Sequence, residues 1–281
     1  MGLIVSRWLF LLLLFLVGCD QPVSLPPEPS PAPPPVTGTQ FVAHHTGRLH
    51  GQLHWQGPLP AVSALESVDH PLELASRPVR ARINPNQLRL AGDRRGVTQA
   101  FVWLEGVDPA RAPPWNPSPA TLVMQAQQLT PERLLLRQGD PLTLQSRDSF
   151  HHTLQARGAH YFSVTLPNPN VPRTRSMTQA GVVEVRSGSG AFWTRAYVLV
   201  QPHPFMAVTD EQGQFSFDQV PAGRYQLHAW HANPFVVQQE RSPDTRRIIQ
   251  VRFDEPFTAQ CPVVVEAGQT TRPVLSMGCV A

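Results

Sequence analysis

The sequence predicts an all-β protein built from two β-sandwiches. The chain has 31 prolines and 18 glycines in 281 residues, and this composition disfavours long helices. From residue 121 to residue 200, short apolar runs alternate with turn residues at intervals of about 8 to 12 residues, which is typical of a sandwich or barrel. The sequence does not alternate strands with helices, which is the pattern that would indicate a parallel sheet. About 240 residues follow residue 40, enough for two compact domains or one large one.

The first 18 residues have the features of a signal peptide. Arg7 precedes an apolar run from Trp8 to Val17, about half the length that spans a bilayer. The run ends in LVGC at 16–19, which resembles the lipobox of bacterial lipoproteins. The resemblance implies cleavage before Cys19, acylation of that residue, and a membrane partner reached through the lipid anchor. We therefore expect a lipoprotein of the bacterial cell envelope, facing the periplasm or the exterior.

Residues 19–40 form a proline-rich segment, QPVSLPPEPSPAPPPVTGTQ after Asp20. Such segments adopt extended polyproline II structure or remain disordered, so we expect a tether between the lipid and the folded part. An SH3-type ligand has a similar composition, but a spacer is the usual role in bacterial envelope proteins.

The charge pattern excludes a nucleic-acid-binding role. The formal net charge is +3, and all 23 basic residues are arginines. They are scattered, whereas a protein that binds nucleic acid concentrates its basic residues on one face.

Two strands are expected early in the folded part. In GRLHGQLHWQ, residues Leu49, Leu53 and Trp55 share one face of a strand. His50 and His54 share the other face about 13 Å apart, too far for one metal ion, and we expect them to be solvated. A second apolar strand covers 97–107, and these segments form an N-terminal extension of the first sandwich.

The second sandwich is expected after residue 201. Phe215 and Phe217, then Tyr225, Leu227 and Ala229, alternate with polar residues on either side of a Pro-Ala-Gly turn, which predicts a β-hairpin with one buried face.

The two C-terminal cysteines, Cys261 and Cys279, are expected to form a disulfide, because an exported chain folds in an oxidising environment. A soft metal pair is the alternative, but no further cysteine or histidine stands nearby at ligand spacing.

Three segments carry a resemblance to a family: VWLEGV at 102–107, SRDSFHHTL at 146–154, and the run from AYVLV to HAWH at 196–231. They resemble bacterial envelope proteins described as methylamine-utilisation-protein-like or plastocyanin-like. The resemblance implies a cupredoxin-like Greek-key sandwich over 41–201. It also implies a carboxypeptidase-regulatory-like sandwich, of the transthyretin and starch-binding type, over 202–281.

The family's copper site uses two His, one Cys and one Met, because soft sulfur and imidazole donors suit both copper states. The resemblance places His152 at the first ligand position. It places Gly188, Ala191 and Thr194 where Cys, His and Met would be. We therefore expect a degenerate site without metal or cofactor, in which His151 and His152 are ordinary turn histidines.

No catalytic motif is present in the sequence, so we expect a non-enzymatic binding or scaffolding protein whose partner is an envelope protein or a glycan. One alternative is a periplasmic copper-binding or electron-transfer protein that uses His152 with His151 or His160. A second alternative is a carbohydrate-binding module. The candidate ligand-binding residues are Trp193, Trp230 and His231. Either tryptophan is as easily a core residue, and packing at the end of a strand is the expected role of Trp230 and His231.

Overall fold

The computed structural model describes residues 40–62, 64–67, 80–92, 95–115, 120–244 and 248–278, all of which belong to one compact unit. Almost all regular structure in these ranges is β-strand, which confirms the predicted fold class. The exceptions are two short 3₁₀ turns, η1 (Ala43–His45) and η3 (Pro109–Arg111). No helix in the described ranges is both long enough and apolar enough to cross a membrane. The predicted signal peptide, Cys19, the tether up to residue 39 and Cys279 lie outside the described residues.

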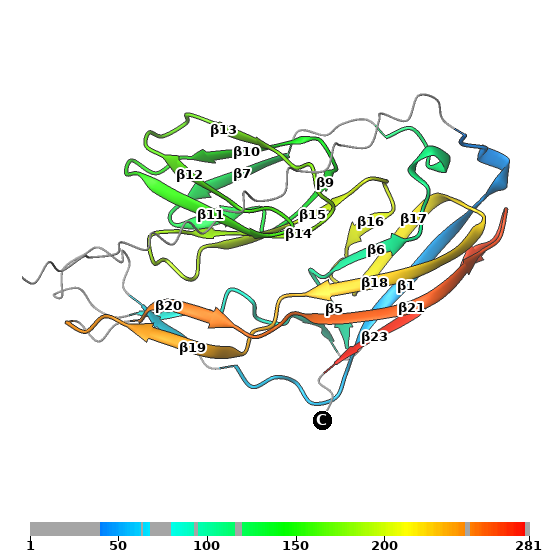
Figure 1. Ribbon diagram of the computed structural model, residues 1–281. Coiled ribbons are helices and arrows are strands. Elements are labelled where there is room, and N and C mark those ends of the chain that lie inside the picture. The colour runs from blue at the N-terminus through cyan, green and yellow to red at the C-terminus, as the bar shows by residue number, and fades with distance from the viewer. Residues whose placement is uncertain are drawn as a thin grey trace, which may run out of the picture. The chain divides into compact units, whose positions relative to one another are not determined.

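The first sandwich contains the strands between residues 120 and 201 (Figure 1). One sheet has the order β13-β10-β7-β8 and the other has the order β12-β11-β14-β15-β9. Leu122, Leu144, Leu154 and Val185 pack between the sheets in the first core. The strands are β7 (Ala120–Gln125), β8 (Gln128–Thr130), β9 (Arg133–Arg137), β10 (Pro141–Ser146), β11 (His152–Gly158), β12 (Phe162–Leu166), β13 (Arg173–Ser176), β14 (Gly181–Ser187) and β15 (Arg195–Gln201).

The second sandwich combines strands from both ends of the folded chain. One sheet contains β17, β1, β5 and β4, with β22 and β23 also paired to β1. The other has the order β16-β6-β18-β21. The strands are β1 (Thr46–Gln56), β4 (Leu90–Ala91), β5 (Gly96–Val97), β6 (Phe101–Glu105), β16 (Met206–Val208), β17 (Gln214–Pro221), β18 (Gly223–His231), β21 (Phe257–Val265), β22 (Thr270–Thr271) and β23 (Val274–Gly278). Two separate pairs are β2 (Leu65–Ser67) with β3 (Arg80–Arg82), and β19 (Val236–Arg241) with β20 (Ile248–Phe253).

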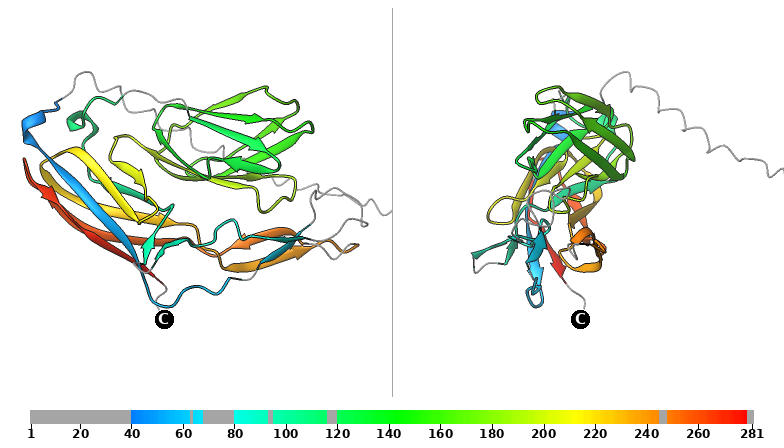
Figure 2. Two further views of the ribbon diagram at one scale, coloured as in Figure 1. Left: turned by 180° about the vertical axis from the view of Figure 1, so that it is seen from behind. Right: turned by 90° about the vertical axis from the view of Figure 1, so that its left-hand side faces the viewer.

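The N-terminal strands do not extend the first sandwich. β1 runs parallel to β23 and antiparallel to β17, so the blue and red ends of the ribbon lie side by side in Figures 1 and 2. β6 pairs with β16 and β18. The sheets therefore group residues 46–105 with residues 206–278, and the strands of 120–201 are inserted between these two parts. The predicted alternation in β1 is confirmed, because Leu49, Leu53 and Trp55 are buried and pack in the second core.

The predicted hairpin after residue 213 is wrong. β17 and β18 are both strands, but β17 pairs with β1 while β18 pairs with β6 and β21 in the facing sheet. Phe215 and Phe217 meet Tyr225 and Leu227 across the core instead of along a shared edge. Alternation predicts that each strand has one buried face. It does not predict whether the next strand pairs beside that strand or packs opposite it, because both arrangements bury the same face.

β15 lies at the contact between the two sandwiches, and all seven of its residues are buried. Ala196, Val198 and Val200 point into the first core. Tyr197 and Leu199, on the other face, join a cluster with Phe101, Met206 and Ala232 of the second sandwich. A strand covered on both faces is apolar at almost every position, which explains the continuous run AYVLV.

Candidate functional site

The positions that the resemblance assigns to copper ligands lie near one another at one end of the first sandwich. The backbone N–H of Gly188 donates to the carbonyl of Thr153 at 2.7 Å, so the loop between β14 and β15 runs beside the start of β11, where His152 stands. Within that loop, the N–H of Thr194 donates to the carbonyl of Ala191 at 2.9 Å.

His152 is held by a carboxylate. Its ring is buried, and its Nε2–H donates to Asp148 Oδ2 at 2.8 Å. Asp148 also accepts from the backbone N–H groups of Ala126, at 2.7 Å, and Gln127, at 3.3 Å. These two residues form the tight turn between β7 and β8, and both have positive φ. Asp148 therefore fastens three segments of the sandwich together.

Thr194 closes the other side of this region. Its side chain is fully buried, and its hydroxyl donates to the carbonyl of Gln127. Gly188 and Ala191 offer no side-chain donor to a metal, and no group of three or more His, Cys, Asp or Glu side chains gathers within the described ranges. This donor set does not fit a cupredoxin copper centre, which needs sulfur and a second imidazole.

The histidines of the alternative copper site lie in different surroundings. His151 is exposed while its neighbour His152 is buried, so the two rings lie on opposite sides of the chain. His160 lies beyond the far end of β11, about 20 Å away along a strand of this length, with its Nε2 3.0 Å from the backbone nitrogen of Gln179. These three residues do not converge on one point.

Replacing Asp148 with Ala should lower the free energy of unfolding by roughly 2 to 4 kcal/mol, because the N–H groups of the β7–β8 turn and the His152 ring lose their shared acceptor. Denaturant unfolding measures the change. Asp148→Asn keeps one oxygen acceptor and should lose less. Equal losses in the two variants would contradict this account of the turn.

The three predicted ligand-binding residues have different surroundings. Trp230 is half-buried on the outer face of β18, packs against Phe101 and Tyr197 with ring centroids 5.7 and 4.9 Å away, and lines a cavity. Trp193 lies outside that cavity, with the guanidinium of Arg82 4.6 Å from its ring centroid. His231 is 1% exposed, and its Nδ1–H donates to the carbonyl of Ala232 at 2.8 Å.

Burial lowers the pKa of His231 to about 4, with the positive charge of Arg133 as the next cause. Burial also lowers the pKa of His203, in the link between β15 and β16, to about 4. Both rings are therefore neutral in the folded protein at pH 7. A neutral buried His231 acts as a structural hydrogen-bond donor at the end of β18.

These two histidines should make the protein less stable in acid. In the unfolded chain they take up protons near pH 6.5, but in the folded protein only near pH 4, so stability falls as the pH drops from about 6.5 to about 4. Each contributes on the order of 3 kcal/mol across that interval. Unfolding of His203→Gln should show a flatter pH dependence than the wild type, whereas replacing the exposed His50 with Gln should not change it. A wild-type stability that stays constant from pH 7 to 4 would contradict this.

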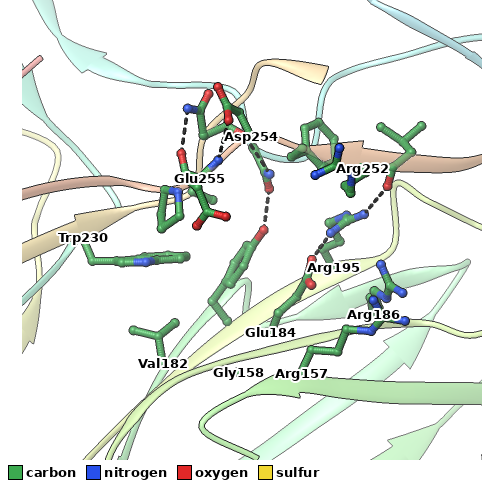
Figure 3. A pocket seen from close by; sticks show the side chains of 17 residues that line it. Arg157, Gly158, Val182, Glu184, Arg186, Arg195, Trp230, Arg252, Asp254 and Glu255 are labelled. Carbon is green, nitrogen blue, oxygen red and sulfur yellow. Dashed lines mark hydrogen bonds and ion pairs between the residues drawn. The ribbon is translucent and has the colours of Figure 1, made fainter. Parts of the chain in front are cut away.

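The cavity lies between the outer face of the first sandwich and the strands β18 and β20, and has a volume of about 430 Å³ (Figure 3). A second hollow of about 430 Å³ adjoins it, sharing Arg157, Arg186, Arg195 and Val251, and reaches Gly188 and Gly190. We call the two together the junction cleft. Its polar lining carries four arginines and three acids, namely Arg157, Arg186, Arg195, Arg252, Glu184, Asp254 and Glu255.

Arg195 joins the walls of the junction cleft. Its guanidinium forms an ion pair with Glu184, donates through Nε to the carbonyl of Phe192 at 3.0 Å, and donates through Nη2 to the carbonyl of Val251 at 3.3 Å. It also lies 4.7 Å from the ring centroid of Phe253. Burial lowers the pKa of Arg195. Because its donors are used by the protein itself, Arg195 is part of the frame.

A second polar bridge crosses at Tyr197. Its hydroxyl donates to Asn86 Oδ1 at 2.8 Å, and the amide Nδ2 of Asn86 donates to the carbonyl of Asn233 at 3.0 Å. Burial raises the pKa of Tyr197, so the phenol stays protonated as the donor. Sequence reasoning missed Asn86, which lies in a stretch without clear periodicity. It also missed the cleft arginines, because charged residues on the outer face of a strand are normally solvated.

Comparisons with known proteins give only distant likenesses. No protein-family model matches the chain, and no curated protein matches it either. Among similar solved structures, a purple cupredoxin from Nitrosopumilus maritimus is 19% identical over 29% of this chain and 99% of its own, with a TM-score of 0.26. An oxidized amicyanin carrying a single substitution is 16% identical over 29% of this chain and 81% of its own, with a TM-score of 0.27.

A Cu-containing nitrite reductase (NirK) from Thermus scotoductus SA-01 is 17% identical over 34% of this chain and 24% of its own, with a TM-score of 0.28. The matched share is about a third of this chain in each case. At these identities and TM-scores the likenesses carry no argument about what the chain binds. Membership of the family and the carboxypeptidase-regulatory-like module stay predictions.

The cysteine prediction also stays open. Cys261 is half-buried on β21, and burial raises the pKa of its thiol. It forms no disulfide within the described residues, and its expected partner Cys279 lies outside them.

Proposed function

We propose that this chain is a non-enzymatic, lipid-anchored binding protein of the bacterial envelope, and that it takes its ligand in the junction cleft. The observation that carries the proposal is the contrast between two regions of the first sandwich. Where the resemblance expects a metal, the side chains are either without donor atoms or already bonded to other parts of the protein. In the junction cleft, aromatic and charged side chains from both sandwiches face a common space.

The frame of the cleft favours binding without a large conformational change. β15 is buried on both faces, and Arg195 and Tyr197 bond to the opposite wall. A site on strands that are fixed in this way keeps its polar groups in place before the ligand arrives, which lowers the entropic cost of binding. Small-ligand sites are commonly concave, aromatic-lined and located between domains.

Copper titration of the full-length protein in detergent tests the metal-free part of this proposal. The wild type should develop no intense visible charge-transfer band and hold no copper stoichiometrically, because Gly188, Ala191 and Thr194 supply neither thiolate nor imidazole. The triple variant Gly188→Cys, Ala191→His and Thr194→Met supplies the missing donors and serves as the positive control. A blue chromophore in the wild type would overturn the proposal.

The same copper titration distinguishes the copper-handling alternative from the proposed function. Only that alternative predicts that His152→Ala lowers the affinity for copper. Nothing in the arrangement of His151, His152 and His160 favours it, since the first is exposed, the second is buried and the third lies beyond the far end of β11.

A carbohydrate ligand is the second candidate, favoured by the position of Trp230 at the cleft. Sugar rings stack on exposed aromatic faces, and the ring of Trp230 is half-buried and lines the cavity. Retention on polysaccharide columns should fall by up to about tenfold in Trp230→Leu and remain in Trp193→Leu, because Trp193 lies outside the cavity. Equal retention of the wild type and both variants would exclude Trp230 as a sugar contact.

A further inference from the structure

We propose that the junction cleft recognises an acidic saccharide, with the carboxylate of the ligand bound between Arg157 and Arg186 and a sugar ring against Trp230. This inference rests on the proposed binding function and adds the chemical class of the ligand. Its basis is the distribution of charge along the cleft and the way each charged side chain is used.

Arg157 and Arg186 are two of the cleft cations, and a third, Arg252, donates through Nε to Gln238 Oε1 at 3.3 Å. Arg157 and Arg186 lie on the neighbouring strands β11 and β14 and project from the outer face of the sheet, with Gln155 opposite Arg186 in the register. Neither arginine forms an ion pair within the described residues, although both line the two hollows. The Nε of Arg186 is buried without a hydrogen-bond partner there.

The arrangement is unfavourable for the protein alone. Burial, and then the nearby charge of Arg157, lowers the pKa of Arg186. Two like charges beside each other on adjacent strands repel, and a buried donor without an acceptor costs free energy. The neighbouring carboxylate of Glu184 is already bound to Arg195. An anionic group between Arg157 and Arg186 would neutralise the repulsion, and guanidinium groups bind carboxylates in a bidentate manner.

The opposite part of the cleft has the reverse charge. Figure 3 shows Asp254 and Glu255 on the side of Trp230, away from Arg157 and Arg186. The backbone here is fixed, since the N–H of Asp254 donates to the carbonyl of Phe235 at 2.9 Å and Asn233 Nδ2 donates to the carbonyl of Glu255 at 2.7 Å. Carboxylates accept hydrogen bonds from hydroxyl groups and repel a second negative charge.

The cleft therefore fits a ligand that is anionic at one end, rich in hydroxyl groups at the other, and flat enough to lie on an aromatic ring. A sugar acid meets all three conditions. A polyphosphate does not, because its charge extends along the whole molecule toward Asp254 and Glu255. Neighbouring strands lie about 4.8 Å apart, and β14 separates Arg157 on β11 from Tyr197 on β15. The two residues are therefore two strand spacings apart, a distance that one or two sugar rings span.

Isothermal titration of the full-length protein in detergent with tri-galacturonic acid tests the inference, and the fully methyl-esterified trimer is the matched uncharged probe. The acid should bind at least about tenfold more tightly than the ester. Arg157→Gln and Arg186→Gln should each weaken acid binding by about tenfold or more and leave ester binding unchanged. Arg175→Gln, an exposed arginine on β13 outside the cleft, is the control and should change neither.

Thermal unfolding separates a binding role from a structural one. Arg186→Gln should unfold at the same temperature as the wild type or higher, because it removes a repulsive charge. A marked loss of stability would show that Arg186 supports the fold, and would count against the inference.

Other outcomes have distinct meanings. Equal binding of acid and ester that is lost in Trp230→Leu would overturn the acidic-ligand inference but support binding in the cleft. Displacement of the acid by inorganic phosphate at similar affinity would identify a simple anion site and overturn the saccharide class. Absence of binding to both trimers would refute the inference, while the copper and column experiments would still judge the proposed function separately.

Discussion

The burial of β15 on both faces is the feature that organises the two sandwiches. Its inner residues complete the core of the first sandwich, and Tyr197 and Leu199 pack against Phe101 and Met206 of the second. A strand in this position can carry polar side chains only where they have partners. Arg195 and Tyr197 meet this condition through Glu184, Val251 and Asn86, so the polar groups of β15 are bonded to the segments around the junction cleft.

The loop that precedes β15 is held by hydrogen bonds at the positions that the resemblance assigns to metal ligands. A metal bound at those positions would tie the turn before β11 to the loop after β14. Here hydrogen bonds tie the same segments, from Asp148 to the β7–β8 turn and to His152, and from Thr194 to Gln127. These bonds need no soft ligand.

The same loop contributes to the junction cleft. Gly188 bonds to Thr153 and, with Gly190, also lines the second hollow beside Arg157 and Arg186. A side chain at Gly188 would lie within 3.3 Å of Thr153 and Gln155, so a small residue keeps that part of the cleft open. The region at the end of the first sandwich and the cleft between the sandwiches are thus adjacent parts of one surface. A change in the loop would affect both.

The strands and their buried faces could be predicted from the amino-acid order. The alternation in β1, the continuous apolar run of β15 and the turn residues between short strands depend on local periodicity, which a single chain displays directly. The chemistry at 188, 191 and 194 was equally predictable, because glycine, alanine and threonine lack soft metal donors wherever the backbone places them.

Strand pairing, in contrast, depends on the folded arrangement. β1 joins β23 from the other end of the chain, and β17 and β18 face each other instead of forming a hairpin, since a buried face is equally satisfied by either arrangement. The junction cleft belongs to this second class. Arg157, Arg186, Trp230 and Asp254 are separated in sequence and look like ordinary outward-facing residues, and they acquire a common environment only when two independently patterned sandwiches pack on β15.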